Sequence, residues 1–158
     1  MVLIKLPKMT QPEINQLLTT QFLCRIAFQD PSGPYIAPFQ YVYLNGTLYF
    51  HFTGYGKKIG LLQEGRSVCV EIEQYTSDLA SYGFVLLAGR LHVVVDSSEK
   101  TLVLSKMVEA AKAKGLSTSF LAAHGFPKNA DWSSLTTDPA LVVVKLVDVS
   151  EVTGLKSP

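Results

Sequence analysis

The chain has 158 residues, of which 47% are hydrophobic and 17% charged, and its formal net charge is +1. This length and composition predict a single domain, residues 1–158, with a sizeable core, and they exclude a disordered chain. The net charge provides no overall field that would attract nucleic acid or an anionic membrane, so neither is an expected partner.

The first residues, M-V-L-I-K-L-P-K, lack the longer apolar run of a signal peptide. No segment has the length and apolar character of a membrane span, so a cytoplasmic protein is expected. Cys24 and Cys69 lie in apolar strand patterns. We expect them to be small buried side chains, with a disulfide or a reactive thiol as the alternatives.

The first predicted element is a helix over Thr10–Thr19. Thr10 and Glu13 predict a capping box, and Pro12 suits the first turn of the helix. The apolar stripe of this helix consists of Ile14, Leu17 and Leu18.

Strand patterns occupy much of the remaining chain, at Phe22–Phe28, Tyr35–Tyr43, Thr47–Phe52, Ser67–Gln74, Tyr82–Val95 and Leu141–Val152. Asn45-Gly46 is the strongest hairpin signal and joins the second strand to the third. Pro38, inside the second strand, requires an edge, a bulge or an interrupted ladder. Gly89 predicts a bulge or a close backbone approach in the fifth strand.

Further helices are predicted at Lys58–Glu64, at Ser97–Lys114 and at Thr118–His124. The apolar face of the longest is assigned to Leu102, Leu104, Met107, Val108 and Ala111. Strands linked by hairpins, with helices at the start, in the middle and late in the chain, predict a mainly β fold: an antiparallel barrel with flanking helices.

The strongest functional signal is the segment Tyr49–Leu62, which reads Y-F-H-F-T-G-Y-G-K-K-I-G-L-L. A strand runs into glycines and two lysines and then into a short helix. This arrangement offers open backbone N–H groups, a positive helix end and an ammonium group to a phosphate. Lys58 begins the helix and Thr53 can donate a hydroxyl hydrogen bond. On residue types alone, a solvated turn with its lysines in water explains the segment equally well.

Two common nucleotide motifs do not match this segment. Gly54, Gly56 and Gly60 miss the dinucleotide-binding spacing by one residue, and the preceding strand belongs to a hairpin rather than to a parallel crossover. The Walker pattern G-x-x-x-x-G-K-[ST] is absent from the sequence.

The order of the motifs resembles the pyridoxamine 5′-phosphate oxidase-related split-barrel proteins, most of all their short branch, which includes the nitroimidazole-resistance reductases. The matching stretches are F-L-C-R-I-A-F, P-Y-I-A-P-F-Q-Y-V-Y, N-G-T-L-Y-F-H-F, G-Y-G-K-K-I-G-L-L, S-V-C-V-E-I and E-V-T-G-L-K-S, together with Ala88–Leu91 before an acidic turn. They cover nearly the whole chain in order. The resemblance implies a six-stranded antiparallel split β-barrel and a homodimer that holds FMN at the subunit interface.

The resemblance also implies cofactor-binding residues. The FMN phosphate would contact Lys57 and Lys58, and the ribityl-phosphate path would follow His51 and Thr53. The isoalloxazine would be passed, mainly through backbone groups, by Pro38, Phe39, Gln40 and Tyr41. One position departs from the pattern, because Phe84 stands where many relatives have a serine, which removes a hydroxyl contact to the cofactor or changes the wall given by the partner subunit.

Other candidate residues have simpler interpretations. We expect His51 to hydrogen-bond the cofactor or the backbone rather than to act as an acid. His92 and His124 are too far apart in sequence for a zinc site. Glu71 and Glu73 alternate with apolar residues, as on the solvent side of a strand. Trp132 either covers the flavin or a substrate, or plugs the barrel.

The resemblance favours an FMN-binding oxidoreductase, in which the flavin takes a hydride from reduced nicotinamide and reduces a small acceptor such as a nitroaromatic or a quinone. The alternatives are a flavin carrier or sensor without turnover, and a protein that uses deazaflavin or haem in the same cleft. Vitamin B6 oxidation is less expected, because the chain lacks an arginine-rich C-terminal segment. No catalytic side chain is predicted.

Overall fold

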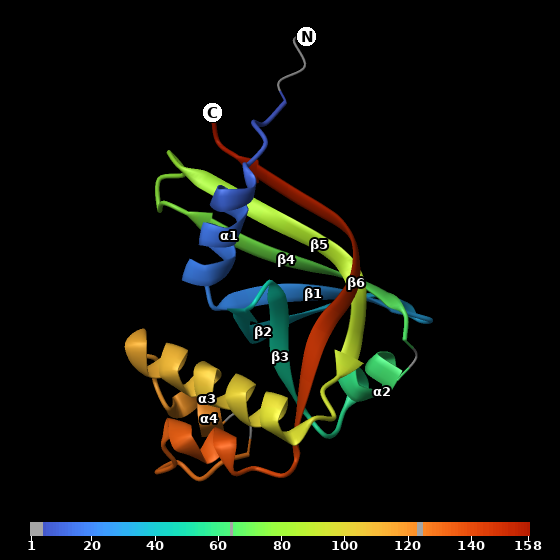
Figure 1. Ribbon diagram of the computed structural model, residues 1–158, viewed down its shortest axis with the longest axis vertical. Helices are drawn as coiled ribbons and strands as arrows, with labels where there is room; N and C mark the ends of the chain where they lie inside the picture. Colours follow the sequence, from blue (N-terminus) through green and yellow to red (C-terminus); the bar gives the residue numbers. More distant parts are fainter. Residues whose placement is uncertain (1–4, 64, 123–124) are drawn as a thin grey trace.

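A computed structural model describes residues 5–63, 65–122 and 125–158 of the chain. Figure 1 shows strands that wrap around one another, with helices against the outside. In chain order the elements are α1 (Gln11–Thr20), β1 (Leu23–Asp30), β2 (Gly33–Leu44), β3 (Thr47–Thr53), α2 (Lys57–Gln63), β4 (Ser67–Tyr75), β5 (Tyr82–Val93), α3 (Ser97–Ala113), α4 (Ser119–Ala122), the 3-10 helix η1 (Trp132–Thr136) and β6 (Leu141–Lys156).

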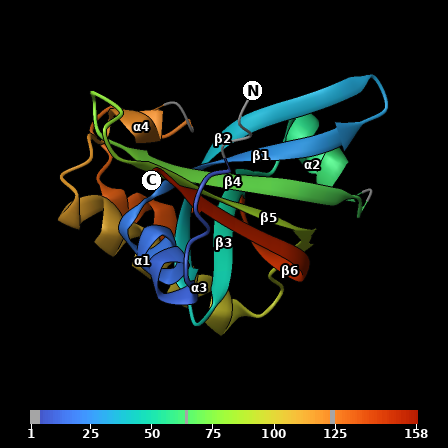
Figure 2. The ribbon, with the colours of Figure 1, turned by 90° about the horizontal axis from the view of Figure 1, so that it is seen from above.

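The strands form a closed six-stranded barrel in the order β1-β2-β3-β6-β5-β4, and every neighbouring pair is antiparallel. The predicted mainly β, split-barrel fold is confirmed. The hairpin predicted at Asn45-Gly46 is present, with φ of 50° and 81° at the two residues, as the tight turn between twisted strands requires. Figure 2, seen from above, shows β1 and β2 extending together beside α2.

The barrel is split between β2 and β3. β1 pairs with β2 along its whole length, from Leu23 opposite Gln40 to Asp30 opposite Gly33. β3 pairs with β2 only from Tyr41 to Leu44. Pro38 therefore lies outside the β2–β3 ladder, which is the interruption that a proline in this strand predicts, since it has no N–H to donate.

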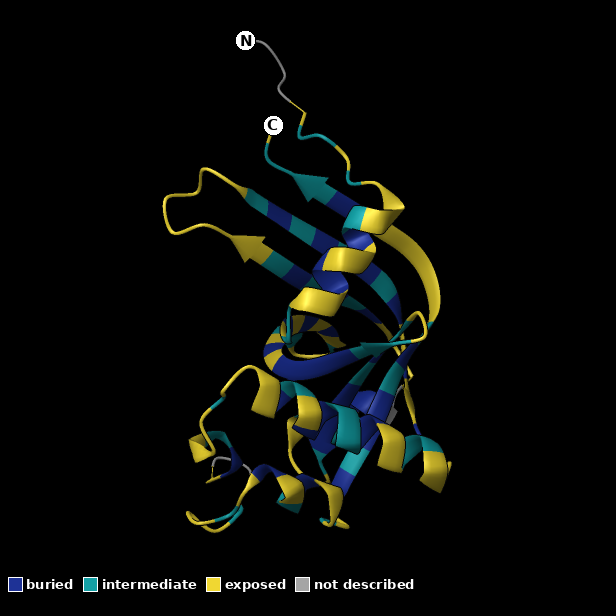
Figure 3. Cartoon of the chain, turned by 60° about the vertical axis from the view of Figure 1, so that its left-hand side comes forward, coloured by how far each residue is buried: buried dark blue, intermediate teal, exposed yellow. Residues whose placement is uncertain are grey.

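The barrel interior is filled by alternating side chains of the strands, and α1 packs against β2, β4 and β5. Figure 3 shows α1 with one buried and one exposed side; the buried side carries the predicted Ile14, Leu17 and Leu18. The capping box forms, because the Thr10 N–H donates to Glu13 Oε2 at 2.8 Å. Glu13 also pairs with Lys156, and these bonds lower the pKa of its carboxyl to about 2.

A second apolar cluster lies outside the barrel, between its β2–β3–β6 side and the layer of α3, α4 and η1. The apolar face of α3 is Val103, Leu104, Met107, Val108 and Ala111. The expectation that Leu102 belongs to this face was wrong, since its side chain is 51% exposed. Val103 precedes Met107 by four residues and therefore lies on the same face of the helix. Leu102 lies on the solvent-exposed side.

Element boundaries differ modestly from the predicted ones. β6 continues to Lys156 rather than Val152, and it stays paired with β5 across a register shift between Ala88 and Arg90. The extra residues at this shift, 148–150, belong to β6 and lie opposite Gly89, so the bulge is in the partner strand; of the two roles predicted for Gly89, the close backbone approach is the one present. α4 ends at Ala122, and the rest of the predicted Thr118–His124 helix, residues 123–124, lies outside the described residues.

We predict that Gly89→Ala destabilises the protein. A Cβ at this position would lie 2.7 Å from the Val147 carbonyl oxygen, and backbone cannot yield as a flexible side chain does. The expected loss is about 1–3 kcal/mol, the usual scale for overpacking, measured by urea unfolding. The control is Gly60→Ala in α2, where a Cβ meets nothing within 4 Å and is expected to stabilise slightly. Equal stability of the two variants would contradict the close approach.

Candidate functional site

The main cavity, of about 770 Å³, lies where β2 and β3 separate. Strand residues, the turn before α2 and the α3–α4 connection together form its walls. Most residues predicted to bind the cofactor line this cavity, namely Pro38, Phe39, Gln40, His51, Thr53 and Lys58. These residues are distant in sequence, and the split in the barrel brings them together.

Tyr41 and Lys57 are not among the lining residues. The Tyr41 side chain is buried in the barrel core, where its hydroxyl donates to the Leu18 carbonyl oxygen at 2.8 Å, and burial raises its pKa. Lys57 pairs with Asp30, and its Nζ lies 4.9 Å from the centre of the Tyr35 ring. The Lys57 ammonium and the Ser32 N–H and hydroxyl lower the pKa of the Asp30 carboxyl to about 2.

Lys58, in the first turn of α2, brings a positive charge to the cavity. Its Nζ lies 4.8 Å from the centre of the Phe39 ring, a cation–π contact. Phe39 in turn stacks on Phe52 with 4.6 Å between ring centres and 23° between planes. Both rings are packed in the barrel core, at 6% and 3% exposure, so the cavity places the Lys58 cation beside a firmly packed apolar wall, which suits a ligand with an anionic end and an apolar ring.

The turn between β3 and α2 is held by its own backbone. The Thr53 hydroxyl donates to the Tyr55 carbonyl oxygen at 3.3 Å. Gly54 is required by packing, because a Cβ there would lie 3.0 Å from the Ala140 carbonyl oxygen. Gly56 lines the cavity and has φ of +91°, a conformation open to glycine. Of the two turn glycines, Gly56 is thus the one placed to meet a ligand.

Two buried polar side chains form part of the cavity wall. Gln40 and His51 are 3% and 4% exposed. Gln40 Nε2 donates to the Met107 carbonyl oxygen at 3.5 Å, whereas Gln40 Oε1 has no hydrogen-bond partner among the described residues. A buried acceptor without a partner is unusual in a native protein. Together with Lys58 and the apolar wall, it fits a ligand that carries a ring N–H and a phosphate.

The helical side of the cavity was not predicted. Leu116 and Ser117, from the α3–α4 connection, and Phe120 of α4 line it together with Phe22. Lys114 anchors this connection: its Nζ donates to the Thr20 carbonyl oxygen at 2.7 Å and lies 5.1 Å from the centre of the Phe22 ring. The sequence carries no local signal for these contacts, since they join segments about a hundred residues apart.

Trp132 lies in the second apolar cluster, where it is 4% exposed and does not line the cavity. Its Nε1 donates to the Leu116 carbonyl oxygen at 3.2 Å, and its ring stacks on Phe120. Of the two interpretations of Trp132, the hydrophobic plug is closer to the structure. The ring fills the second apolar cluster, between the barrel and the helices, and does not fill the barrel itself.

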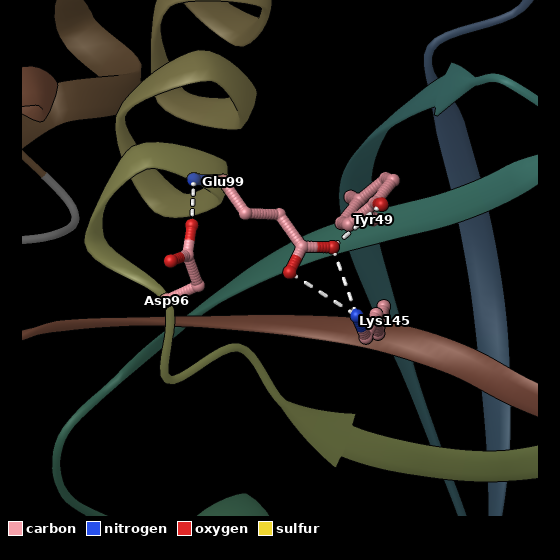
Figure 4. A network of polar contacts seen from close by, with 4 residues as sticks. All are labelled: Tyr49, Asp96, Glu99 and Lys145. Carbon is pink, nitrogen blue, oxygen red and sulfur yellow. Dashed lines mark hydrogen bonds and ion pairs between the residues drawn. The ribbon is translucent and has the colours of Figure 1, made fainter.

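The start of α3 is fixed to the sheet by Glu99 (Figure 4). Its carboxylate accepts the Tyr49 hydroxyl at 2.8 Å and pairs with Lys145 Nζ at 2.9 Å. Asp96 caps the same helix by accepting the Glu99 N–H at 2.6 Å. The Lys145 ammonium, followed by the Tyr49 hydroxyl, lowers the pKa of Glu99. These bonds set the position of the helix whose far end supplies the cavity wall.

The remaining candidates lie away from the cavity. His92 is exposed on β5, and His124 lies outside the described residues. Arg25 pairs with Glu71 and Glu73 on the outside of the barrel at 3.1 and 2.7 Å. Cys24 is buried and Cys69 half-buried, and both are free thiols. Phe84 is half-buried on β5 and does not line the cavity of its own chain.

Across residues 5–63, 65–122 and 125–158, no group of His, Cys, Asp and Glu side chains is arranged to hold a metal ion. No helix in these ranges is long and apolar enough to span a membrane.

The closed six-stranded barrel with a cavity at its split defines a split-barrel protein. Its residues 10–147 match the family described as pyridoxamine 5′-phosphate oxidase, and the chain belongs to this family. No curated protein matches the chain in sequence.

Solved structures share this fold at low sequence identity. An FAD-binding protein from Mesorhizobium loti is 19% identical, with a TM-score of 0.66, over 98% of this chain and 100% of that one. A candidate 5-nitroimidazole antibiotic resistance protein from Bacteroides thetaiotaomicron is 20% identical, with a TM-score of 0.66, over 96% and 87%. The haem storage protein HutZ from Vibrio cholerae is 13% identical, with a TM-score of 0.66, over 92% and 94%.

We predict that Glu99→Gln lowers the free energy of unfolding at pH 7 by about 1 kcal/mol, because the substitution removes the half-buried ion pair between Glu99 and Lys145. Since the folded pKa of Glu99 is lowered, this contribution is present above the pKa of an unfolded glutamate, about 4.3. It disappears as the pH falls through the lower folded pKa. Urea unfolding of both proteins across this pH range measures the difference.

The matched control is Glu109→Gln, on the same helix, whose ion pair with Lys106 is exposed. It is expected to change the free energy of unfolding little. A difference between wild type and Glu99→Gln that stays constant down to the lowest pH would contradict the role of the ionised carboxylate.

Proposed function

We propose that the protein binds FMN in this cavity and acts as a flavin-dependent oxidoreductase on a small acceptor. The observation that carries the proposal is the cavity itself, which joins the Lys58 cation to a largely apolar wall at the split of the barrel. Its volume of about 770 Å³ lies within the usual range of cofactor sites. The family match supports the same ligand class, because structures of this fold include flavin-binding proteins.

Each part of the cavity has a role in this proposal. Lys58 would pair with the phosphate, and the backbone at Gly56 would approach it closely. His51 and Thr53 would lie beside the ribityl chain. The ring would lie along Pro38, Phe39 and Gln40, where β2 pairs with β1 but not with β3 and where the Gln40 Oε1 could accept a ring N–H.

Lys57 and Tyr41 are expected phosphate and ring contacts by family resemblance, and they would act differently from the lining residues. Lys57 would have to exchange its ion pair with Asp30 for the phosphate, which makes it a weaker candidate than Lys58. Tyr41 would contribute only backbone groups, since its hydroxyl is used in the core.

A bound flavin supplies the redox chemistry, taking a hydride from reduced nicotinamide and returning two electrons to a small acceptor such as a nitroaromatic or a quinone. The protein's own residues bind and orient the ring, and their apolar side chains exclude water from one face of it. No side chain of the cavity is required as a proton donor. Reduced nicotinamide as the donor agrees with a cytoplasmic location, which we also propose.

We further propose a homodimer in which the partner subunit closes the cavity. An apolar row crosses the outer face of the barrel in register, formed by Ile36, Ala27, Cys69 and Ala88. Ile36 is 62% exposed and Leu23 51% exposed in the single chain, and Leu23 also lines the cavity. The ion pairs of Arg25 with Glu71 and Glu73 lie between this row and Leu23, so the surface suited to a subunit interface is an apolar row bordered by charged residues. Phe84, on the same side of β5, would then belong to the interface rather than to the cofactor.

We predict that the purified protein, incubated with FMN and desalted, shows the absorption bands of oxidised flavin. Reduced nicotinamide should bleach these bands, and a nitroaromatic or a quinone should restore them. Flavin bands without bleaching would indicate a carrier or sensor, and a Soret band after incubation with haem instead would indicate the haem-binding alternative. A protein that takes up no FMN would refute the proposed function.

We predict that Lys58→Ala weakens FMN binding by about 1.5–3 kcal/mol, or ~10- to 150-fold in Kd, the scale of a hydrogen bond to a charged group. Calorimetric titration measures the effect. The control is Lys106→Ala, which removes an exposed lysine of α3 that does not line the cavity. Riboflavin, which has no phosphate, should bind wild type and Lys58→Ala with the same affinity. If Lys58→Ala lost riboflavin and FMN binding equally, Lys58 would not hold the phosphate.

A further inference from the structure

Among the described residues of the helical layer, the aromatic side chain that lines the cavity is Phe120 of α4. It lines the cavity and lies edge-on to His51, with 6.2 Å between ring centres and 86° between planes. Its neighbour Leu121 is fully buried in the second apolar cluster and fixes the short helix that carries it. The backbone of this turn is closed by the Phe120 N–H, which donates to the Ser117 carbonyl oxygen at 3.3 Å.

Trp132 supports the Phe120 ring from the side away from the cavity. The two rings are stacked, with 5.9 Å between centres and 26° between planes. Trp132 is itself held by its hydrogen bond to the Leu116 carbonyl oxygen and by the buried cluster around it. The orientation of Phe120 is therefore set by a buried ring that makes no contact with the cavity.

Aromatic rings also line the barrel side of the same cavity, where Phe39 and Phe52 form a stacked pair. The two sides come from different parts of the fold, the barrel and the helical layer. Lys58 and the glycine turn lie with the barrel side, so the features that suit a phosphate and a cofactor ring are gathered there. Among the described residues, the helical side contributes the uncharged Leu116, Ser117 and Phe120 to the lining.

We infer that Phe120 is a specificity-determining residue that stacks on the acceptor and selects flat, conjugated rings over acceptors without a ring. Trp132 is the positioning residue that holds Phe120 in place. The inference rests on the proposed function, since it concerns the second ligand of the same site. Stacked aromatic pairs contribute about 0.5–1.5 kcal/mol beyond the area they bury, which corresponds to ~2- to 12-fold in affinity.

The test compares Phe120→Leu and Phe120→Met with Phe120→Tyr, which keeps a ring. FMN-loaded protein without a reductant is titrated with 4-nitrobenzyl alcohol by calorimetry, so that binding is measured in the absence of turnover. We expect the first two variants to weaken binding ~2- to 12-fold and Phe120→Tyr to match wild type. Trp132 is the only tryptophan of the chain, so its emission wavelength verifies that the helical layer remains packed in each variant.

Turnover provides the second measurement, with ferricyanide as an acceptor that has no ring to stack. Phe120→Leu should lower kcat/KM for the nitro compound ~2- to 12-fold more than it lowers the ferricyanide rate. Binding equal to wild type in both ringless variants, or an equal loss with the two acceptors, would overturn the inference. Failure of the wild-type protein to take up FMN would instead refute the proposed function, and with it the inference.

Discussion

The site depends on one constraint, which is that β2 changes its neighbour along its length. Its residues 33–40 pair with β1, and Tyr41–Leu44 pair with β3. Pro38 is compatible with this arrangement. It has no backbone N–H to donate, and at its position β3 is not paired with β2 and so offers no carbonyl that would need one. The cavity occupies the space that a longer β3 pairing would have closed.

The helical layer completes the cavity, and its position is determined by polar contacts at both ends of α3. Glu99 ties the beginning of the helix to Tyr49 and Lys145 on the sheet. Lys114, just beyond its end, bonds the Thr20 carbonyl oxygen at the end of α1. Between these points the apolar face of α3 packs on the second cluster. A shift of α3 would therefore move the cavity wall, so stability of this layer and shape of the site are coupled.

Local signals made much of the fold predictable. The capping box, the Asn45-Gly46 hairpin, the interruption at Pro38 and the close backbone approach at Gly89 each follow from the chemistry of a few adjacent residues, and each is present. Most of the candidate site was predictable as well, because its barrel side lies on two neighbouring strands and the turn that follows. What the sequence could not indicate depends on contacts between distant segments: the partner of Lys57, the inward direction of Tyr41, and the wall around Phe120.

The connection between β5 and β6 has a consequence for how such a protein can diversify. The chain leaves β5 at Val93 and returns at Leu141, and its two ends stay together because Val94 N–H donates to Val143 O at 2.8 Å. β5 and β6 are paired with each other directly. The segment between them, residues 94–140, can therefore be lengthened or changed at little cost in chain entropy. Mutation can therefore remodel the Phe120 side of the cavity while the Lys58 side is inherited intact, so that, under the proposed function, a descendant could take a new acceptor and still bind the same cofactor.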